Sequence, residues 1–488
     1  MKVLMIASEA APLAKTGGLA DVLGALPPEL ARRGCDVRLA LPLYASVDRA
    51  KFDVRLASAA PLGVPIGPGE QWCAVHEARL PGSAVPVYLF EHHRYFSRPT
   101  LYQFNGRDYD DNAERFAFLP RAALQWCKAL DWVPDVVHAH DWQAALAPMF
   151  LKTHYREDPH LAGTASVMSL HNLGYQGNFR KEDLAHGQFG WEHFTPGGLE
   201  FHGGINYLKA GILFADKVAT VSPTYAWEIA TPEGGWGLDP ALRTRLGDLV
   251  GILNGLDYRE WNPAADAALP ARFDAADLAG KAVCKAALQQ QFGLPVRPEV
   301  PIVGVVTRLA YQKGIDVLAA AAPRLAELDL QLVVLGDGEV WANFFYGDLP
   351  RRYPGKIGVH VGYDDRKAHL VYAGSDLFLM PSRYEPCGLG QLSAKRYGAV
   401  PVVRATGGLR DTVAQYDEAT GAGDGFRFED LTPEALANTV GWAVSTWYDR
   451  PEHFARLRQR GMADRFDWAN AAARYADLYR WAVERKRR

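Results

Sequence analysis

The stretch Pro381-Ser-Arg-Tyr-Glu-Pro-Cys-Gly-Leu-Gly-Gln391 joins a predicted buried strand to a predicted helix, and it decides the fold. The apolar run Asp376–Met380 before it has the length of a buried strand. Residues 391–398 after it are typical of a short helix that ends at a glycine. Ligands bind at the carboxyl ends of strands in open α/β sheets. The carboxylate of Glu385 is therefore a candidate ligand-binding group, beside helix-start amides near Gly388 and Leu389.

The same strand-to-helix pattern recurs along the whole chain and predicts α/β structure with parallel sheets. Further buried strands are predicted within 3–7, 36–41, 135–142, 166–170, 217–221, 301–306, 331–335, 357–362 and 400–404. Thr16-Gly-Gly-Leu-Ala-Asp21 and Thr406-Gly-Gly-Leu-Arg-Asp411 are the same turn, once in each half. Two doubly wound domains that face each other would place both turns at one interdomain cleft.

The predicted domains are residues 1–250 and 251–466, followed by a closing helix over 467–488 that packs back on the first domain. The boundary is placed where an Asn-Gly turn near residue 254 is followed by a Pro- and Ala-rich segment, Trp261–Pro270. The closing helix begins at an N-cap, Asp467. The aromatic segment Pro81–Asp111 is interpreted as a long loop that reaches toward a cleft.

Composition excludes several classes of function. The chain has 488 residues, a formal net charge of −3, and 48% hydrophobic residues, so we expect no nucleic-acid partner. It has no apolar run of bilayer-spanning length, so we expect no membrane partner. Its five cysteines are scattered without CxxC spacing, which favours free thiols in a reducing cytosol. We therefore expect a cytoplasmic protein, with no transit segment before its first strand.

Two sets of residues are candidates for chemistry before any family is considered. Lys15-Thr-Gly-Gly18 offers a cation and a helix N-terminus to a phosphate, although it is not a Walker A loop. His138 and His140 lie on one face of a predicted strand, and His171 follows the next strand. A metal-dependent hydrolase is an alternative built on this pair. No further ligand cluster of metal-binding spacing is evident, so no metal is predicted.

Seven motifs, in this order, resemble those of the bacterial glycogen synthase and plant starch synthase family: Lys15-Thr-Gly-Gly-Leu-Ala-Asp21, His138-Ala-His-Asp-Trp142, His171-Asn172, Asn254-Gly255, Arg308-Leu-x-x-Gln-Lys-Gly314, Glu385-Pro-Cys-Gly-Leu389 and Thr406-Gly-Gly-Leu409. The resemblance spans almost the whole chain. It implies a retaining glucosyltransferase of the GT-B type, with two Rossmann-like domains that face a deep interdomain cleft. It also implies transfer of glucose from ADP-glucose to the non-reducing end of an α-1,4-glucan, without a metal or other cofactor.

The resemblance assigns roles to particular residues. The expected catalytic set is Glu385, Arg308, Lys313, His171, Asp141 and Lys15. In this set the cations would stabilise the diphosphate, and the remaining side chains would contact the sugar. The expected nucleotide-sugar contacts are Lys15, Gly17, Gly18, Asp21, Tyr95, Asn172, Asn254, Gln312, Tyr363, Cys387, Gly388, Leu389 and Thr406. Tyr363 would stack on adenine. Many related GT-B enzymes carry a second Glu where this chain has Leu392, so its ribose contacts stay unassigned.

Three other interpretations stay open from the sequence. The first is a related GT-B transferase that uses UDP-glucose or another acceptor, because nothing in the residues favours adenine over uracil. The second is the metal-dependent hydrolase described above. The third is a glucan-binding protein with an inactive transferase fold, which intact Lys15, Arg308, Lys313 and Glu385 argue against. The oligomeric state is not predicted.

Overall fold

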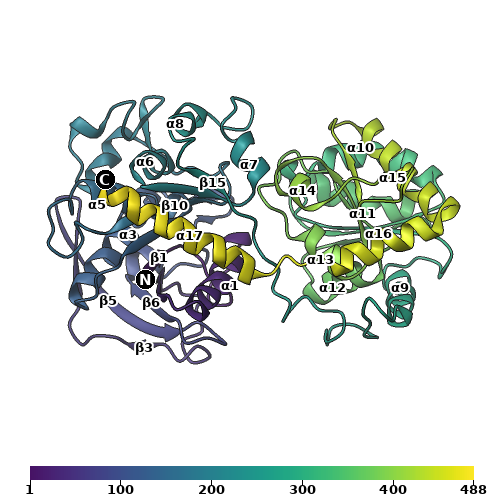
Figure 1. Cartoon of the computed structure of the whole chain (residues 1–488), viewed down its shortest axis with the longest axis horizontal. Helices are drawn as coiled ribbons and strands as arrows, with labels where there is room; N and C mark the ends of the chain where they lie inside the picture. The colour runs from purple at the N-terminus through teal and green to yellow at the C-terminus, as the bar shows by residue number, and fades with distance from the viewer. The chain divides into compact units, whose positions relative to one another are not determined.

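The computed structural model describes all residues, 1–488, and the chain forms two compact units (Figure 1). The first unit contains Met1–Val221, Ala226–Asn254 and Trp468–Arg488; the second contains Ser222–Tyr225 and Gly255–Asp467. The predicted first domain, 1–250, is therefore wrong at residues 222–225. Within the second unit, Ser222 Oγ donates a hydrogen bond to the Pro386 carbonyl at 2.6 Å, and Thr224 Oγ1 donates to Asp411 Oδ1 at 2.7 Å.

The first unit is built on a largely parallel sheet in the order β15-β14-β10-β9-β1-β2-β6-β5-β3. The parallel strands are β1 (Lys2–Ile6), β2 (Asp36–Pro42), β6 (Pro86–Glu91), β9 (Val136–His140), β10 (Ala165–Leu170), β14 (Lys217–Thr220) and β15 (Leu249–Gly251). The antiparallel edge is formed by β5 (Gly69–Arg79), β3 (Arg55–Leu56) and β4 (Leu62–Ile66). Strands β9 and β10 are buried along their whole length, as expected for parallel strands covered on both faces.

Helices cover this sheet, and its last helix comes from the end of the chain. The main helices are α1 (Gly18–Arg32), α3 (Asn112–Ala129), α5 (Leu146–Lys152), α6 (Tyr207–Phe214) and α17 (Trp468–Arg487). Helix α17 contacts α1, β9, β10 and β14, and Figure 1 shows it crossing the sheet of the first unit. Its buried face carries Tyr475, Leu478 and Tyr479. The closing helix thus completes the core of the first unit.

The second unit is a six-stranded, fully parallel sheet in the order β18-β17-β16-β19-β20-β21. Its strands are β16 (Ile302–Val306), β17 (Gln331–Gly336), β18 (Ile357–Val361), β19 (Leu377–Met380), β20 (Val400–Arg404) and β21 (Phe426–Phe428). Numbered along the unit, this is the order 3-2-1-4-5-6 of Rossmann folds. The prediction of two Rossmann-like domains is confirmed.

Two hydrophobic cores lie on the two faces of the second sheet. One core packs α10 (Ile315–Glu327), α11 (Val340–Arg352), α15 (Pro433–Asp449) and α16 (Pro451–Ala463) against the strands. The other core packs α9 (Ala279–Gln291), α12 (Asp365–Gly374) and α13 (Gly390–Arg396). Each face therefore excludes water from the strands, and this leaves the strand ends as the place where polar side chains meet solvent.

The interpretation of Pro81–Asp111 as one long loop is wrong. The segment contains β6, the short helix α2 (His93–Phe96) and a hairpin of β7 (Gln103–Phe104) and β8 (Arg107–Asp108). The guanidinium of Arg115, a fully buried residue of α3, donates to the Tyr95 carbonyl at 2.7 Å and to the Leu101 carbonyl at 2.8 Å. These bonds and the surrounding aromatic contacts hold the segment against the core.

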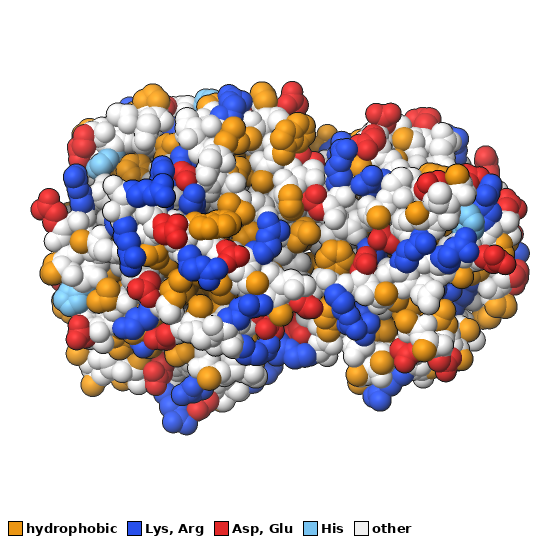
Figure 2. All heavy atoms as spheres, viewed as in Figure 1, with side chains coloured by type: hydrophobic (Ala, Val, Ile, Leu, Met, Phe, Trp, Pro, Cys, Tyr) orange, Lys and Arg blue, Asp and Glu red, His pale blue; other side chains and the backbone are white.

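The surface carries both signs of charge. Figure 2 shows Lys and Arg side chains interspersed with Asp and Glu over the visible face of both units, in keeping with the net charge of −3. The visible face therefore offers no single-sign field to a polyanion. No helix combines the length and the hydropathy needed to cross a bilayer.

Candidate active site

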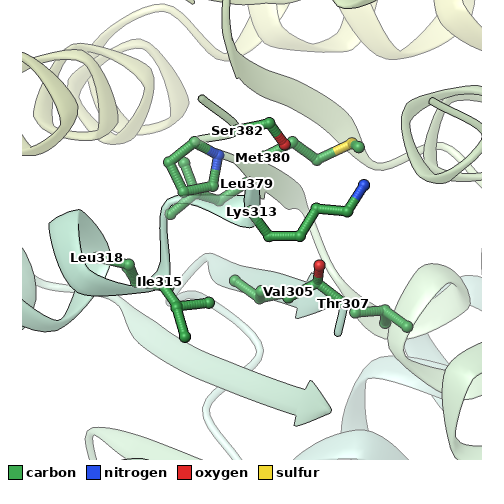
Figure 3. Close-up of a pocket in the computed structure, with 10 residues that line it drawn as sticks. Val305, Thr307, Lys313, Ile315, Leu318, Leu379, Met380 and Ser382 are labelled. Atoms are coloured by element: carbon green, nitrogen blue, oxygen red, sulfur yellow. The ribbon is translucent and has the colours of Figure 1, made fainter. Parts of the chain in front are cut away.

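The second unit gathers predicted site residues where its strand order reverses. Strands β16 and β19 are neighbours in the sheet, and the chain leaves their carboxyl ends into the segments 307–314 and 381–389. Such a reversal point is the usual ligand site of an open α/β sheet. A pocket lies here, between residues 305–307 on one strand end and 379–382 on the other, and Lys313 lines it. Figure 3 shows the amino end of Lys313 directed away from Ile315 and Leu318.

Lys313 and Glu385 form a largely buried ion pair at this point. The Lys313 Nζ lies 2.9 Å from Oε1 and 2.7 Å from Oε2 of Glu385. Ser382 Oγ donates a further hydrogen bond to Oε2 at 2.9 Å. The side chains of Lys313 and Glu385 are 18% and 6% exposed. Because burial weakens screening by water, each charge fixes the position of the other.

The other predicted contacts of this unit lie in the same segments or at the end of a nearby strand. Arg308 is exposed and donates from Nη2 to Gln312 Oε1 at 3.2 Å. Gln312 in turn donates to the Tyr384 carbonyl at 3.4 Å. Tyr363 follows β18 and is 83% exposed, so its ring can stack on a planar group. A planar cation, an ammonium and an exposed aromatic ring thus lie along one edge of the sheet.

Glycines let the segments around Glu385 approach one another closely. A Cβ on Gly314, whose φ is +67°, would lie 1.9 Å from the Pro381 carbonyl oxygen. A Cβ on Gly407, whose φ is +46°, would lie 1.9 Å from the Glu385 carbonyl oxygen. The next residue, Gly408, donates its N–H to that same carbonyl at 3.0 Å. Thr406 and helix α14 (Gly407–Thr412) are thereby held against the backbone of Glu385.

We expect Gly407→Ala to destabilise the second unit by about 1–3 kcal/mol and to reduce activity, because the methyl group must push the Glu385 backbone aside. The matched control is Gly293→Ala. Gly293 also has a positive φ, +69°, but nothing lies within 4 Å of its would-be Cβ. Its substitution therefore measures only the free-energy cost of placing alanine at a positive φ. Denaturant unfolding of both variants measures the difference. Equal losses in the two variants would contradict the close-approach explanation.

The first unit has a comparable edge where β1 and β9 lie side by side. Glu9, just beyond β1, is buried, and its carboxylate accepts hydrogen bonds from Thr16 N at 2.5 Å, Thr16 Oγ1 at 2.7 Å and Gly17 N at 3.3 Å. The Tyr102 hydroxyl donates to the same carboxylate at 2.5 Å. Glu9 therefore fixes the turn that carries Lys15. The would-be Cβ atoms of Gly17 and Gly18 meet nothing within 4 Å, which leaves the backbone of this turn open to a ligand.

Asp141 and His171 meet at the next strand ends of the same sheet. Asp141 begins the short helix α4 (Asp141–Ala144) with φ at +53°, an uncommon conformation for a residue other than glycine. Its Oδ1 accepts the His171 backbone N–H at 2.7 Å. Burial raises the pKa of the Asp141 carboxyl to about 7, although the backbone N–H groups of His171 and Asn172 act in the opposite direction. Strained backbone and a perturbed carboxyl are both common at functional sites, and Asp141 stays a predicted sugar contact.

Asp141→Asn is expected to change the pH dependence of stability. A carboxyl whose pKa is raised in the folded state binds more protons there than in the unfolded chain, so stability falls as pH rises between about 4 and 7. The asparagine variant lacks this loss, which approaches about 1.4 kcal/mol per pH unit for one proton. Denaturant titrations of both proteins from pH 4.5 to 8 test it. The control is Asp53→Asn, at an exposed aspartate with φ of +48°. Parallel pH curves for the native chain and Asp141→Asn would contradict the prediction.

His138, the first histidine of β9, has both ring nitrogens engaged within the first unit. His138 Nδ1 lies 2.8 Å from the Tyr479 hydroxyl, and His138 Nε2 lies 2.7 Å from Ser169 Oγ. Both ring nitrogens are therefore engaged by α17 and β10. No group of three or more His, Cys, Asp or Glu side chains is placed to hold a metal ion. Of the two histidines on which the metal-dependent hydrolase was built, His138 is thus committed to contacts within the protein.

The remaining predicted site residues differ in where the structure places them. Tyr95 is fully buried and its hydroxyl donates to Glu114 Oε1 at 2.6 Å, and its contact with the donor stays a prediction. Asn254 is also buried, and its Oδ1 has no hydrogen-bond partner. Cys387 is 5% exposed. Gly388, with φ at +74°, and Leu389 directly precede α13, as predicted.

Two residues outside the predicted site set contact its members. They are Glu9, which holds the Lys15 turn, and Ser382, which holds the Glu385 carboxylate. His140, which the sequence suggested only as a candidate metal ligand, is a partner of His171. Glu9 and Ser382 each follow within three residues of a predicted strand end. The strand-end argument that selected Glu385 could have selected both.

Comparison with known proteins gives matches over both units. Residues 2–244 match the family described as "Starch synthase catalytic domain", and residues 288–461 match "Glycosyl transferases group 1". A "Glycogen synthase 1" of Geobacter metallireducens is 50% identical over 487 residues, which cover 100% of this chain and 97% of that protein. A "Glycogen synthase" of Anaeromyxobacter dehalogenans is 48% identical and covers 98% of this chain and 99% of that one.

A solved structure shares the architecture as well. The catalytic domain of Starch Synthase IV from Arabidopsis thaliana, bound to ADP and acarbose, superposes with a TM-score of 0.90. It is 33% identical, and the match covers 99% of each chain. A sucrose-phosphate synthase from Thermosynechococcus elongatus is 17% identical with a TM-score of 0.59, and this likeness concerns the fold alone.

Proposed function

The chain belongs to the glycogen synthase and starch synthase family of GT-B glucosyltransferases, and from this premise we propose that it transfers glucose from ADP-glucose to the non-reducing end of an α-1,4-glucan with retention of configuration. The observation that carries the proposal is the Lys313–Glu385 pair, with Arg308 five residues before the lysine, at the reversal point of the second sheet. This arrangement offers positive charge to a leaving diphosphate and a fixed carboxylate to the sugar.

The cations carry out the electrostatic part of the reaction. As the bond from the glucosyl carbon to the diphosphate breaks, negative charge grows on the phosphate oxygens and positive charge on the sugar ring. Arg308 and Lys313 bind the diphosphate. Glu385 contacts glucose hydroxyls and offsets the ring charge. It is not assigned as a nucleophile, because a double-displacement mechanism uses two carboxyl groups about 5–5.5 Å apart and the sequence offers no obvious second one.

The first unit supplies sugar contacts and one more cation. Asp141 and His171 bind glucose hydroxyls, and Lys15 approaches the phosphates of the same donor. The proposal requires the two units to act on one nucleotide sugar. Two observations support it. Each unit carries polar residues at the carboxyl ends of its parallel strands, and these residues match the motifs of the family.

No metal is needed in this proposal. Arg308, Lys313 and Lys15 supply the positive charge that a divalent ion would bring to a diphosphate. Activity should survive treatment with a chelator followed by desalting. Loss of activity that returns on adding magnesium or manganese would overturn this part of the proposal. The cytoplasmic location stays a prediction.

A competition between nucleotide sugars tests the donor. ADP-glucose and UDP-glucose are supplied in equal amounts, each with a different isotope in its glucose, together with a maltooligosaccharide. We expect incorporation from ADP-glucose to dominate, in line with the ADP bound to the Arabidopsis relative. Preferential incorporation from UDP-glucose would favour the alternative transferase. No incorporation from either, in a folded protein that still binds glucan, would favour an inactive glucan-binding protein.

A further inference from the structure

His140 is hydrogen-bonded to His171 and has no contact with solvent. Its side chain is 0% exposed, and its Nδ1 lies 3.0 Å from His171 Nε2. Its other ring nitrogen, Nε2, is buried and has no hydrogen-bond partner. The ring of His138 lies beside it, tilted by 37° with ring centroids 3.9 Å apart, but both nitrogens of His138 are committed to Tyr479 and Ser169. His171 is therefore the one ring that His140 engages by hydrogen bonding.

A hydrogen bond between two neutral imidazoles needs one N–H and one bare nitrogen. If His171 donated from Nε2, His140 would carry its proton on its own Nε2, a buried N–H without an acceptor. If His140 donates from Nδ1, its Nε2 is bare, and no buried N–H is left unmatched. In proteins, buried N–H donors without a partner are rarer than buried acceptors without one. The second arrangement is therefore favoured.

Both rings are neutral near pH 7, as this argument requires. Burial lowers the pKa of His171 to about 4, and burial together with the neighbouring histidines lowers the pKa of His140 well below its ordinary value. A neutral His171 that accepts at Nε2 must carry its single proton at Nδ1. Its backbone N–H, bonded to Asp141 Oδ1, fixes the residue that bears this ring.

We propose that His140 is a positioning residue, which donates its Nδ1 proton to Nε2 of His171 and so fixes His171 as the Nδ1–H tautomer facing the sugar. His171 then acts toward a glucose hydroxyl as a neutral hydrogen-bond donor, while Asp141 acts as an acceptor. This assignment rests on the proposed function for its sugar ligand, but the tautomer itself is a property of the ligand-free protein.

The tautomer can be observed without any substrate. The full chain is labelled with 15N-histidine, and the His171 signals are identified by their loss in His171→Asn. At pH 7 we expect His171 Nδ1 to carry the proton and Nε2 to show the shift of a bare, hydrogen-bonded nitrogen. A proton on His171 Nε2 would overturn the proposal.

Three variants of His140 separate a positioning role from a packing role. His140→Phe keeps an aromatic ring of similar volume but removes the N–H donor. We expect His171 to lose its tautomer preference in this variant. We also expect kcat to fall on the order of tenfold to a hundredfold, with ADP affinity unchanged. His140→Asn places an amide N–H near the lost Nδ1 and should restore both readouts. His140→Gln places its amide near the former Nε2 and should not. If Asn is no better than Phe and Gln, the proposal fails.

These measurements also separate this proposal from the proposed function. If the native chain shows the expected tautomer but transfers no glucose from ADP-glucose, the positioning role stands and the proposed function fails. If transfer occurs and the tautomer is the opposite one, the proposed function stands and the positioning role fails.

Discussion

Replacing Arg308 with Ala is expected to lower kcat for glucosyl transfer by about 10²–10³-fold, which corresponds to about 2.7–4 kcal/mol of lost transition-state stabilisation. Arg308 is exposed and hydrogen-bonded to Gln312, so its removal leaves no buried group without a partner. Its guanidinium is needed most when the diphosphate gains charge, so the loss should appear in kcat more than in KM.

Steady-state kinetics with ADP-glucose and a maltooligosaccharide measure this effect. The matched control is Arg351→Ala, which removes another exposed arginine, from α11 of the same unit. We expect the control to keep its kcat and both variants to keep their thermal unfolding midpoint. A near-normal kcat with only a raised KM in Arg308→Ala would contradict the leaving-group role.

A single substitution is not enough to test Lys313, because its charge is paired with that of Glu385. Lys313→Ala should lower kcat to a similar extent, but it also strands a carboxylate whose side chain is 6% exposed. Glu385→Gln and the double variant complete a mutant cycle. The unfolding free energy of the double variant should exceed that of Lys313→Ala, because the stranded charge is gone. The catalytic loss should persist in the double variant.

The strand ends that carry the candidate residues of each unit could be predicted from the sequence, because strand ends are local features. Apolar runs such as Leu377–Met380 are buried on both faces, and the polar residues that follow them must lie at the carboxyl edge. The repeated Thr-Gly-Gly-Leu turns at residues 16 and 406 mark the same edge in the two units. The family resemblance then supplied roles that spacing alone does not give.

The contacts among the candidate residues of each unit could not be predicted in this way. The Lys313–Glu385 pair joins residues 72 positions apart, and the Glu9 carboxylate meets the Thr16 hydroxyl across a turn. Both depend on how loops fold over a strand edge, which hydrophobic periodicity does not encode. The close approach at Gly407 likewise depends on the backbone of Glu385 from another loop.

The burial of Tyr95, in a segment expected to be an exposed loop, has a specific physical cause. A segment rich in Tyr, His and turn residues has the composition of an exposed loop, and composition gives no sign of its hydrogen-bond partners. The partner is Arg115, a charged residue within α3, which is itself fully buried among Phe96, Tyr109 and Phe116. A buried arginine runs against the usual placement of charge, so local patterns predict the opposite environment.

Replacing Lys15 with Gln is expected to abolish most glucosyl transfer while changing the affinity for ADP only modestly. Lys15 belongs to the first unit, whereas Arg308, Lys313 and Tyr363 belong to the second, which should bind ADP largely by itself. The Lys15 Nζ lies 2.6 Å from Asp21 Oδ1 in an ion pair whose side chains are 49% and 30% exposed. Such a pair contributes only about 0–1 kcal/mol, so a phosphate can compete with Asp21 for the ammonium.

Glutamine keeps the hydrogen-bonding capacity of position 15 and removes its charge, so the variant isolates the electrostatic contribution. Calorimetric titration with ADP and steady-state kinetics are measured on the same preparation, with Lys51→Gln, an exposed lysine of the first unit, as the matched control. We expect a fall in kcat of about 10²-fold or more in Lys15→Gln and none in Lys51→Gln. Glu9 should still hold the turn, because it accepts hydrogen bonds from Thr16 and Gly17. An equal and large loss in ADP binding and in transfer would place Lys15 in the ground-state complex and contradict its selective action on the transition state.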